Sequence, residues 1–300
     1  MLNVSKKVKD RKRFGVIITI IVVFAVALVA AAFVMLYRKS RNTGPDTTQY
    51  EYGVFLGAEP EDMEYMKKYK IIVLEGQSFS KEQIEELKAE GHTVYSYINV
   101  GALENYRPYY KDYEKYTLDV YENWEDERWV DVSQKEWQEF ITADIAKSLV
   151  DKGVDGLFVD NLDVYYHYQN EAVFEGITYI LKTFKEYGMY VSINGGDVYV
   201  TEYLNRYNTL DVIDAVNQET VFSKILWDGD KFSTQEKSER EYFQEYLSNV
   251  KSAGKDVYLL EYTTDEELIK EIDDYCKEKG YIYYASPKLN LEAAPPDQQP

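Results

Sequence analysis

The stretch GVDGLFVDNLDVY, residues 153–165, decides the fold of this chain. Its centre, GLFVD (156–160), is a short apolar run that runs into the polar turn DNLD (160–163). Short β-branched or aromatic runs bounded in this way predict strands that are buried on both faces of a parallel sheet. Seven further runs share the pattern, at residues 52–57, 70–75, 93–99, 190–194, 212–217, 256–262 and 281–286.

Amphipathic helical stretches fill most of the gaps between these predicted strands. Three of them, at residues 81–91, 133–153 and 265–280, each end in a glycine, which commonly stops a helix. Alternating strands and helices predict a parallel sheet, and eight repeats in about 250 residues predict an α/β fold of the (β/α)8 TIM-barrel type. We place this barrel at residues 52–290, followed by a C-terminal tail at 291–300. A doubly wound open sheet is the alternative, but the sequence lacks the glycine-rich phosphate loop expected after its first strand.

The N-terminal region predicts a membrane anchor. Residues 14–36 form an uncharged apolar segment of 23 residues. At about 1.5 Å per residue, a helix of this length crosses a hydrocarbon core of about 30 Å. Six cations precede the segment and three follow it, which places the N-terminus in the cytoplasm. We therefore predict a single-pass protein of the cell membrane, with a cytoplasmic tail (1–13), a transmembrane helix (14–36), a linker (37–51) and an extracellular barrel domain. A cleaved signal peptide is the alternative, although its apolar core usually has only about 7–15 residues.

Charge and cysteine content exclude several classes of protein. The chain carries 34 Lys and Arg against 53 Asp and Glu, a net charge of -19. Nine of the cations and one acid lie in residues 1–41, which leaves 25 cations, 52 acids and a net charge of -27 in the remainder. Such a surface repels nucleic acid. The single cysteine, Cys276, excludes an internal disulfide framework, and neither His92 nor His167 lies in a zinc-binding spacing, so we predict no metal or cofactor.

Polar residues concentrate where the predicted strands end, and in a barrel this is the active face. Carboxylates, amides and aromatic rings together are typical of a sugar site, because carboxylates act as acid, base or nucleophile, amides bind hydroxyls and rings pack on pyranose faces. The long connection at 101–131 adds eight tyrosines or tryptophans, and the alternative for any one ring is simple packing onto the barrel. The predicted substrate-binding residues are Tyr97, Asn99, Glu104, Tyr106, Arg107, Tyr109, Asp131, Asn161, Asp163, Tyr165, Asn194, Trp227, Glu261 and Tyr262.

Five blocks of the sequence resemble glycoside hydrolase family 114, the endo-α-1,4-polygalactosaminidase-like barrels. They are YINVGALENYR (97–107), WVDVS (129–133), GVDGLFVDNLDVY (153–165), SINGG (192–196) and AVNQETVFS (215–223). The resemblance implies a (β/α)8 barrel that cleaves an α-linked, galactosamine-rich polysaccharide, and it places the catalytic carboxylates on Asp160 and Glu219. Two positions depart from the family pattern: Asn99 stands where the family has a serine, and Ala102 where it has a glutamate.

The surroundings of the two carboxylates predict their roles, with the reversed assignment as the alternative. Asp160 is the expected ionised member, because Asn161 and the polar turn around it stabilise charge, and Asp163 is the reserve candidate for the same role. Glu219 is the expected acid, because nearby Val221 and Phe222 desolvate it and favour its protonated form. A cationic amino-sugar polymer is the predicted partner, since the acidic domain attracts it. The competing interpretation is a non-catalytic, polysaccharide-binding barrel of an export or adhesion system.

Overall fold

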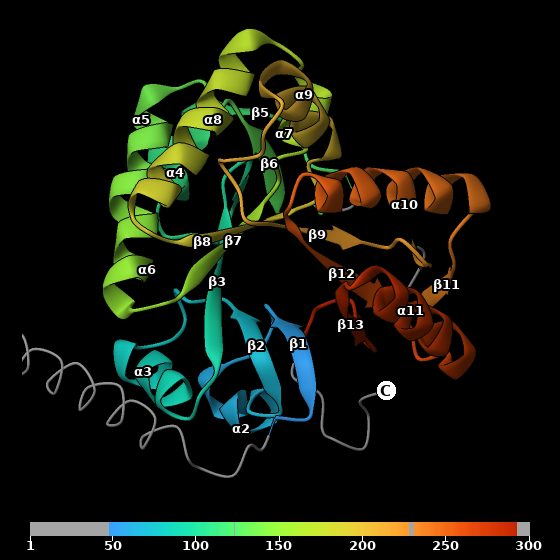
Figure 1. The fold of residues 1–300 in the computed structure, drawn as a ribbon. Coiled ribbons are helices and arrows are strands. Elements are labelled where there is room, and N and C mark those ends of the chain that lie inside the picture. Colours follow the sequence, from blue (N-terminus) through green and yellow to red (C-terminus); the bar gives the residue numbers. More distant parts are fainter. Residues whose placement is uncertain (1–47, 123, 228–230, 293–300) are drawn as a thin grey trace, which may run out of the picture. The chain divides into compact units, whose positions relative to one another are not determined.

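Eight parallel strands form a nearly closed barrel in the computed structural model, which describes residues 48–122, 124–227 and 231–292. The first and last strands of the sheet, β1 and β13, lie side by side and bring its two edges together (Figure 1). The order around the sheet is β1 (Tyr50–Phe55), β2 (Tyr69–Leu74), β3 (Thr93–Asn99), β7 (Gly156–Asp160), β8 (Tyr190–Asn194), β9 (Ala215–Glu219), β12 (Asp256–Tyr262) and β13 (Ile282–Ser286).

Tyrosines fill much of the barrel interior. The rings of Tyr52 on β1 and Tyr258 on β12 lie 4.9 Å apart, although these strands are not neighbours in the sheet, so the contact crosses the interior. Their hydroxyls find partners there: Tyr52 donates to Asn217 Oδ1 on β9 at 3.0 Å, and Tyr258 lies 2.8 Å from the hydroxyl of Tyr190 on β8. A buried tyrosine needs such a partner, and these bonds link strands that are not neighbours in the sheet.

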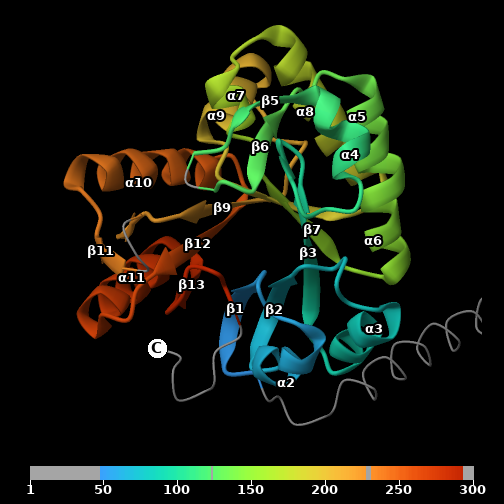
Figure 2. The same ribbon diagram turned by 180° about the vertical axis from the view of Figure 1, so that it is seen from behind.

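Helices cover the outside of the ring of strands (Figures 1 and 2). In α8 (Glu171–Glu186), Asn170 caps the N-terminus by accepting from the Val173 amide at 3.1 Å, and the buried residues recur at helical spacing, as at Phe174, Ile177 and Leu181. The other helices are α2 (Met63–Met66), α3 (Lys81–Ala89), α5 (Lys135–Glu139), a π-helical segment (Phe140–Ala146), α6 (Lys147–Lys152), α7 (Val164–His167), α9 (Asp197–Tyr207), α10 (Lys237–Ser252) and α11 (Glu266–Lys279), with 3₁₀ turns at Pro60–Asp62 and Glu114–Tyr116.

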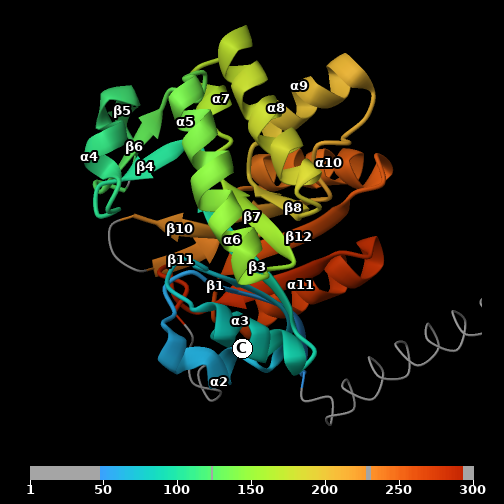
Figure 3. The same cartoon turned by 90° about the vertical axis from the view of Figure 1, so that its left-hand side faces the viewer.

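Two insertions stand on one side of the barrel, beyond the ends of its strands (Figure 3). The first follows β3 and contains α4 (Tyr110–Tyr113) and an antiparallel sheet of β4 (Ala102–Glu104), β6 (Glu127–Val130) and β5 (Thr117–Val120). The second follows β9 and is the hairpin of β10 (Ser223–Leu226) and β11 (Lys231–Thr234). The long connection predicted at 101–131 is therefore a folded unit.

The predicted elements agree with this architecture. All eight predicted barrel strands are present, although the sixth, expected at 212–217, occupies Ala215–Glu219. Gly153 and Gly280 end their helices in the left-handed conformation, with φ of 92° and 68°, as glycine at a helix C-terminus allows. The helix expected at 133–153 is one helical run with the π-helical segment at its centre.

The predicted cytoplasmic tail, the transmembrane segment at 14–36 and most of the linker lie outside the described residues, as does most of the predicted C-terminal tail. Within the described part of the chain, the helices are too short or too polar to cross a membrane.

Candidate active site

A cavity of about 650 Å³ opens at the carboxyl ends of the barrel strands. Both insertions contribute to its walls, through Trp124 and Glu127 of the first and Ile225 and Trp227 of the second. Ten of the residues predicted from the sequence line it: Asp160, Glu219, Tyr97, Tyr106, Arg107, Asn161, Asp163, Asn194, Trp227 and Tyr262.

One amide holds the two predicted catalytic carboxyl groups together. Asn194 Nδ2, at the end of β8, donates to Asp160 Oδ1 at 3.0 Å and to Glu219 Oε1 at 2.7 Å. Because both oxygens bond to the same nitrogen, they cannot lie farther apart than the two distances combined, 5.7 Å. Both carboxyl groups face the cavity, so a single sugar unit can contact both.

Further hydrogen bonds hold the side-chain amide of Asn194 in its orientation. Asn194 Oδ1 accepts from Asn217 Nδ2 at 2.7 Å, and Asn217 Oδ1 in turn accepts from the Tyr52 hydroxyl. The second carboxyl oxygen of Glu219, Oε2, accepts from the Tyr262 hydroxyl at 2.8 Å. This chain of bonds orients the Asn194 amide with both hydrogens toward the carboxyl groups, which preorganises the pair before substrate arrives.

Burial raises the pKa of both members of the pair. The pKa of Asp160 rises to about 6, first because the carboxyl is buried and then because of the charge of Glu219. Hydrogen bonds from Asn194, the Asn161 amide and Tyr97 oppose this rise. Burial also raises the pKa of Glu219, opposed by its bonds from Asn194 and Tyr262. Asp160 therefore has more support for its ionised form, and Glu219 is suited to carry a proton.

The turn after Asp160 adopts an unusual backbone conformation. Asn161 has a φ of 65°, in the left-handed region that asparagine tolerates better than most residues. The turn directs the Asn161 amide nitrogen to Asp160 Oδ1 at 2.9 Å and its side chain to Asn99 Oδ1 at 3.0 Å. Asp163 ends the turn beside Gly195 and Gly196, and burial followed by the charge of Asp197 raises its pKa to about 7.

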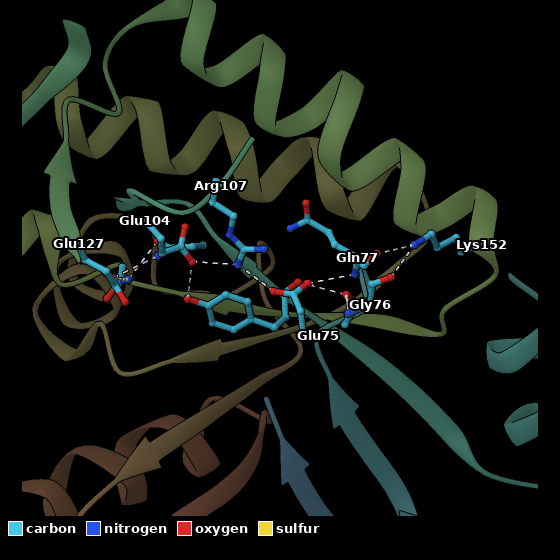
Figure 4. Close-up of polar contacts among 11 residues, drawn as sticks. Glu75, Gly76, Gln77, Glu104, Arg107, Glu127 and Lys152 are labelled. Atoms are coloured by element: carbon cyan, nitrogen blue, oxygen red, sulfur yellow. Dashed lines mark hydrogen bonds and ion pairs between the residues drawn. The ribbon is translucent and has the colours of Figure 1, made fainter. Parts of the chain in front are cut away.

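A buried ion-pair network supports one wall of the cavity (Figure 4). Arg107 Nη2 lies 2.8 Å from Glu75 Oε2, at the end of β2, and 2.9 Å from Glu104 Oε1 on β4. Glu104 is 1% exposed, so its charge depends on this partner. The network joins the first insertion to the barrel.

Six predicted binding residues lie outside the cavity lining. Their side chains form hydrogen bonds or ring contacts with other residues of the protein. Asn99 and Glu104 lie behind the wall, bonded to Asn161 and Arg107 respectively. Tyr109 packs edge-on against Phe140, and Tyr165 is buried against Phe174 and Tyr199. Asp131 accepts from Ser133 and Gln134 at the start of the following helix, and Glu261 accepts from the amides of Phe222 and Ser223 in the second insertion.

The cavity also contains residues that the sequence alone did not identify as binding residues. Glu127 is the most notable, because burial, Glu104 and Asp160 raise its pKa to about 8. Aromatic rings also line the cavity, among them Tyr121, Trp124, Trp129 and Tyr166. His167 also lines the cavity, and its ring centre lies 4.7 Å from that of Trp129, with the two rings tilted by 42°. Among the described residues there is no group of acidic, histidine or cysteine side chains that could hold a metal ion.

A (β/α)8 barrel with a bridged pair of carboxyl groups in an aromatic cavity at the carboxyl ends of its strands defines a carbohydrate-cleaving enzyme of the glycoside hydrolase class. Glycoside-hydrolase family GH114 matches residues 36–288, and the chain belongs to this family. It is a glycoside hydrolase.

Two curated proteins are similar in sequence to this chain. The chain is 25% identical over 235 residues to an uncharacterized protein of Methanocaldococcus jannaschii, covering 71% of this chain and 66% of that protein. It is 26% identical over 229 residues to an uncharacterized protein of Thermotoga maritima, covering 71% and 70%. The chain thus spans about two thirds of the length of these relatives.

Two solved structures share the fold. The glycoside hydrolase domain of PelA from Pseudomonas aeruginosa superposes with a TM-score of 0.68 at 18% identity, covering 80% of this chain and 96% of that one. Aspergillus fumigatus Ega3, solved in complex with galactosamine, superposes with a TM-score of 0.64 at 15% identity, covering 84% and 96%.

Proposed function

We propose that this protein is an extracellular, membrane-anchored endo-glycosidase that cleaves an α-linked polymer of galactosamine or N-acetylgalactosamine. The observation that carries the proposal is the Asp160–Asn194–Glu219 bridge in a cavity lined by both insertions. The galactosamine bound to Ega3, which shares the fold, supports the choice of sugar.

In the proposed mechanism, Asp160 is the nucleophile and Glu219 is the acid. Glu219, protonated because of its burial, donates its proton to the leaving glycosidic oxygen while the Asp160 carboxylate attacks the anomeric carbon. The resulting glycosyl ester is then hydrolysed by water, from which Glu219 takes a proton. Asn194 contacts both groups throughout and keeps their separation constant.

The separation of the carboxyl groups favours retention of configuration. The nearest oxygens lie within 5.7 Å, below the range of about 6.5–9.5 Å that leaves room for an attacking water in inverting enzymes. We expect the first product released from an α-linked substrate to be the α-anomer, observed by proton NMR before mutarotation. An initial β-anomer would assign Asp160 the role of a base that activates water.

Trp227 is expected to bind the polymer. It lines the cavity mouth, is 48% exposed and packs edge-on against Trp124 of the other insertion at 5.9 Å. Trp227→Ala should weaken polymer binding about 10-fold, as loss of an aromatic sugar platform does, without lowering the melting temperature. Tyr179→Ala is the matched control, because Tyr179 is also 48% exposed but lies on α8, away from the cavity lining. Equal binding by the two variants would remove Trp227 from the polymer path.

The substrate itself is tested by incubating the purified full-length protein with defined galactosamine and N-acetylgalactosamine oligomers and measuring product masses. Internal cleavage should release mixed short oligomers from either series. Intact oligomers of both kinds would exclude this sugar class, and a panel of other α-linked polysaccharides would then identify the substrate.

The proposed anchor rests on the uncharged segment at 14–36 and its flanking cations. We expect protease added to intact cells to digest the barrel domain, while the mature protein retains Met1. A mature N-terminus within the small-residue stretch near Ala32 would instead show that the segment is a cleaved signal peptide.

A further inference from the structure

Glu127 is a cavity-lining carboxyl group that forms no ion pair with any of the described residues. It begins β6 and pairs directly with Glu104 on β4, an arrangement in which two like charges repel. Arg107 neutralises Glu104 and Glu75, and Figure 4 shows its guanidinium directed to these two residues, with Glu127 on the far side of Glu104. The charge of Arg107 lowers the pKa of Glu127 only slightly, whereas burial and the charges of Glu104 and Asp160 raise it, so Arg107 stabilises the ionised Glu127 weakly.

The hydrogen bonds of Glu127 leave one oxygen for a ligand. Asn99 Nδ2 and Asn161 Nδ2 each donate to Oε2 at 3.4 Å, whereas within the described chain Oε1 receives no such bond. Asn161 also holds Asp160 through its backbone amide. Asn161 thus links Glu127 to Asp160, as Asn194 links Glu219 to Asp160.

Basic residues are few in the described lining of the cavity, which contains only Arg107 and His167. Its described lining contains the carboxyl groups of Glu75, Glu122, Asp163 and Asp197 besides those already discussed, and Arg107 is its only lysine or arginine. A carboxylate accepts hydrogen bonds and attracts cations, so a ligand that satisfies Glu127 must bring donors and positive charge. An ammonium group on the sugar provides both, whereas an acetamido group carries no charge.

We propose that Glu127 is the residue that recognises a free amino group on the sugar bound beside Asp160, and so sets a preference for deacetylated over N-acetylated units. This inference rests on the proposed function for its substrate class. The raised pKa of the Glu127 carboxyl agrees with it, because an ammonium ion would supply the counter-charge that the protein lacks.

Glu127→Gln tests the inference, since it keeps the shape of the side chain and removes its charge. Calorimetric binding of a fully deacetylated and a fully N-acetylated galactosamine oligomer is measured for the full-length protein and the variant. We expect Glu127→Gln to lose affinity for the deacetylated oligomer about 10- to 100-fold, and to bind the acetylated one within about twofold of the parent. The ratio of kcat/KM for the two oligomers should change in the same direction.

Glu125→Gln is the matched control, because Glu125 is exposed in the same insertion, outside the cavity lining, and the substitution removes the same charge. It should leave both affinities unchanged. An unchanged preference in Glu127→Gln, equal loss for both oligomers, or equal effects of the two substitutions would each overturn the inference. Binding with preference but no cleavage by the parent would count against the proposed function alone, and a parent that binds neither oligomer would overturn both.

Discussion

Asp160→Asn and Glu219→Gln are each expected to lower kcat at least about 10³-fold while the barrel stays folded. Asparagine cannot form the glycosyl ester, and glutamine cannot donate a proton to the leaving oxygen. Both replacements are nearly isosteric, and Asn194 still finds an acceptor oxygen in each, so melting curves should stay close to that of the parent. Turnover is measured on an oligomer that the parent cleaves.

The two substitutions are distinguished by the substrate that rescues them. A substrate with an activated leaving group needs no proton, so it should restore much of the turnover of Glu219→Gln and none of that of Asp160→Asn. In Glu219→Gln, Asp160 should also ionise at lower pH, because the charge of Glu219 raises the Asp160 pKa in the parent. The acid limb of the pH profile of kcat/KM should therefore lie at lower pH in Glu219→Gln than in the parent, whose Asp160 pKa is about 6. Rescue of Asp160→Asn instead would exchange the two roles.

Arg107→Ala is expected to cause the largest loss of stability, about 3–5 kcal/mol in the free energy of unfolding. The substitution leaves Glu104 and Glu75 with uncompensated charges, although only 2% and 13% of their side chains are exposed. Arg107→Lys should be only partly tolerated, since one ammonium group does not match the geometry of the guanidinium. Urea denaturation, followed by circular dichroism, measures the change.

The exposed pair Lys111–Glu114 provides the control, because its atoms are 3.0 Å apart and both side chains reach solvent. Lys111→Ala should leave the urea midpoint unchanged. Adding Glu104→Gln to Arg107→Ala should recover part of the lost stability by removing one buried charge. If Arg107→Ala unfolds at the same urea concentration as Lys111→Ala, the network does not hold the insertion on the barrel.

The barrel could be predicted because strands that are buried on both faces appear in the sequence as continuous apolar runs. The sixth strand, expected at 212–217 but found at Ala215–Glu219, shows where an apolar run fails to locate a strand boundary. Val212 and Ile213 are 2% and 1% exposed, yet they lie in the turn before β9. Their burial gives the turn the same apolar composition as the strand, so composition could not place the boundary.

The positions of Asp160 and Glu219 at strand ends could be predicted because strand ends follow from strand positions, whereas the contacts of the surrounding residues depend on side-chain direction. Glu261 and Tyr262 are adjacent on β12 and point to opposite sides. Tyr262 bonds to Glu219, while Glu261 bonds to the second insertion. Glu127 was missed because its place depends on antiparallel pairing with β4, which no periodic pattern in 101–131 reveals.

The two insertions differ from the barrel in how they are assembled. Each is closed by pairing between strands that are near in sequence, whereas Asp160 and Glu219 stand on strands of the surrounding ring. Under the proposed function, bond cleavage and polymer binding are therefore encoded in separate stretches of the gene. Substitutions in the two insertions would then change the walls of the cavity while leaving the two carboxyl groups on the barrel strands in place.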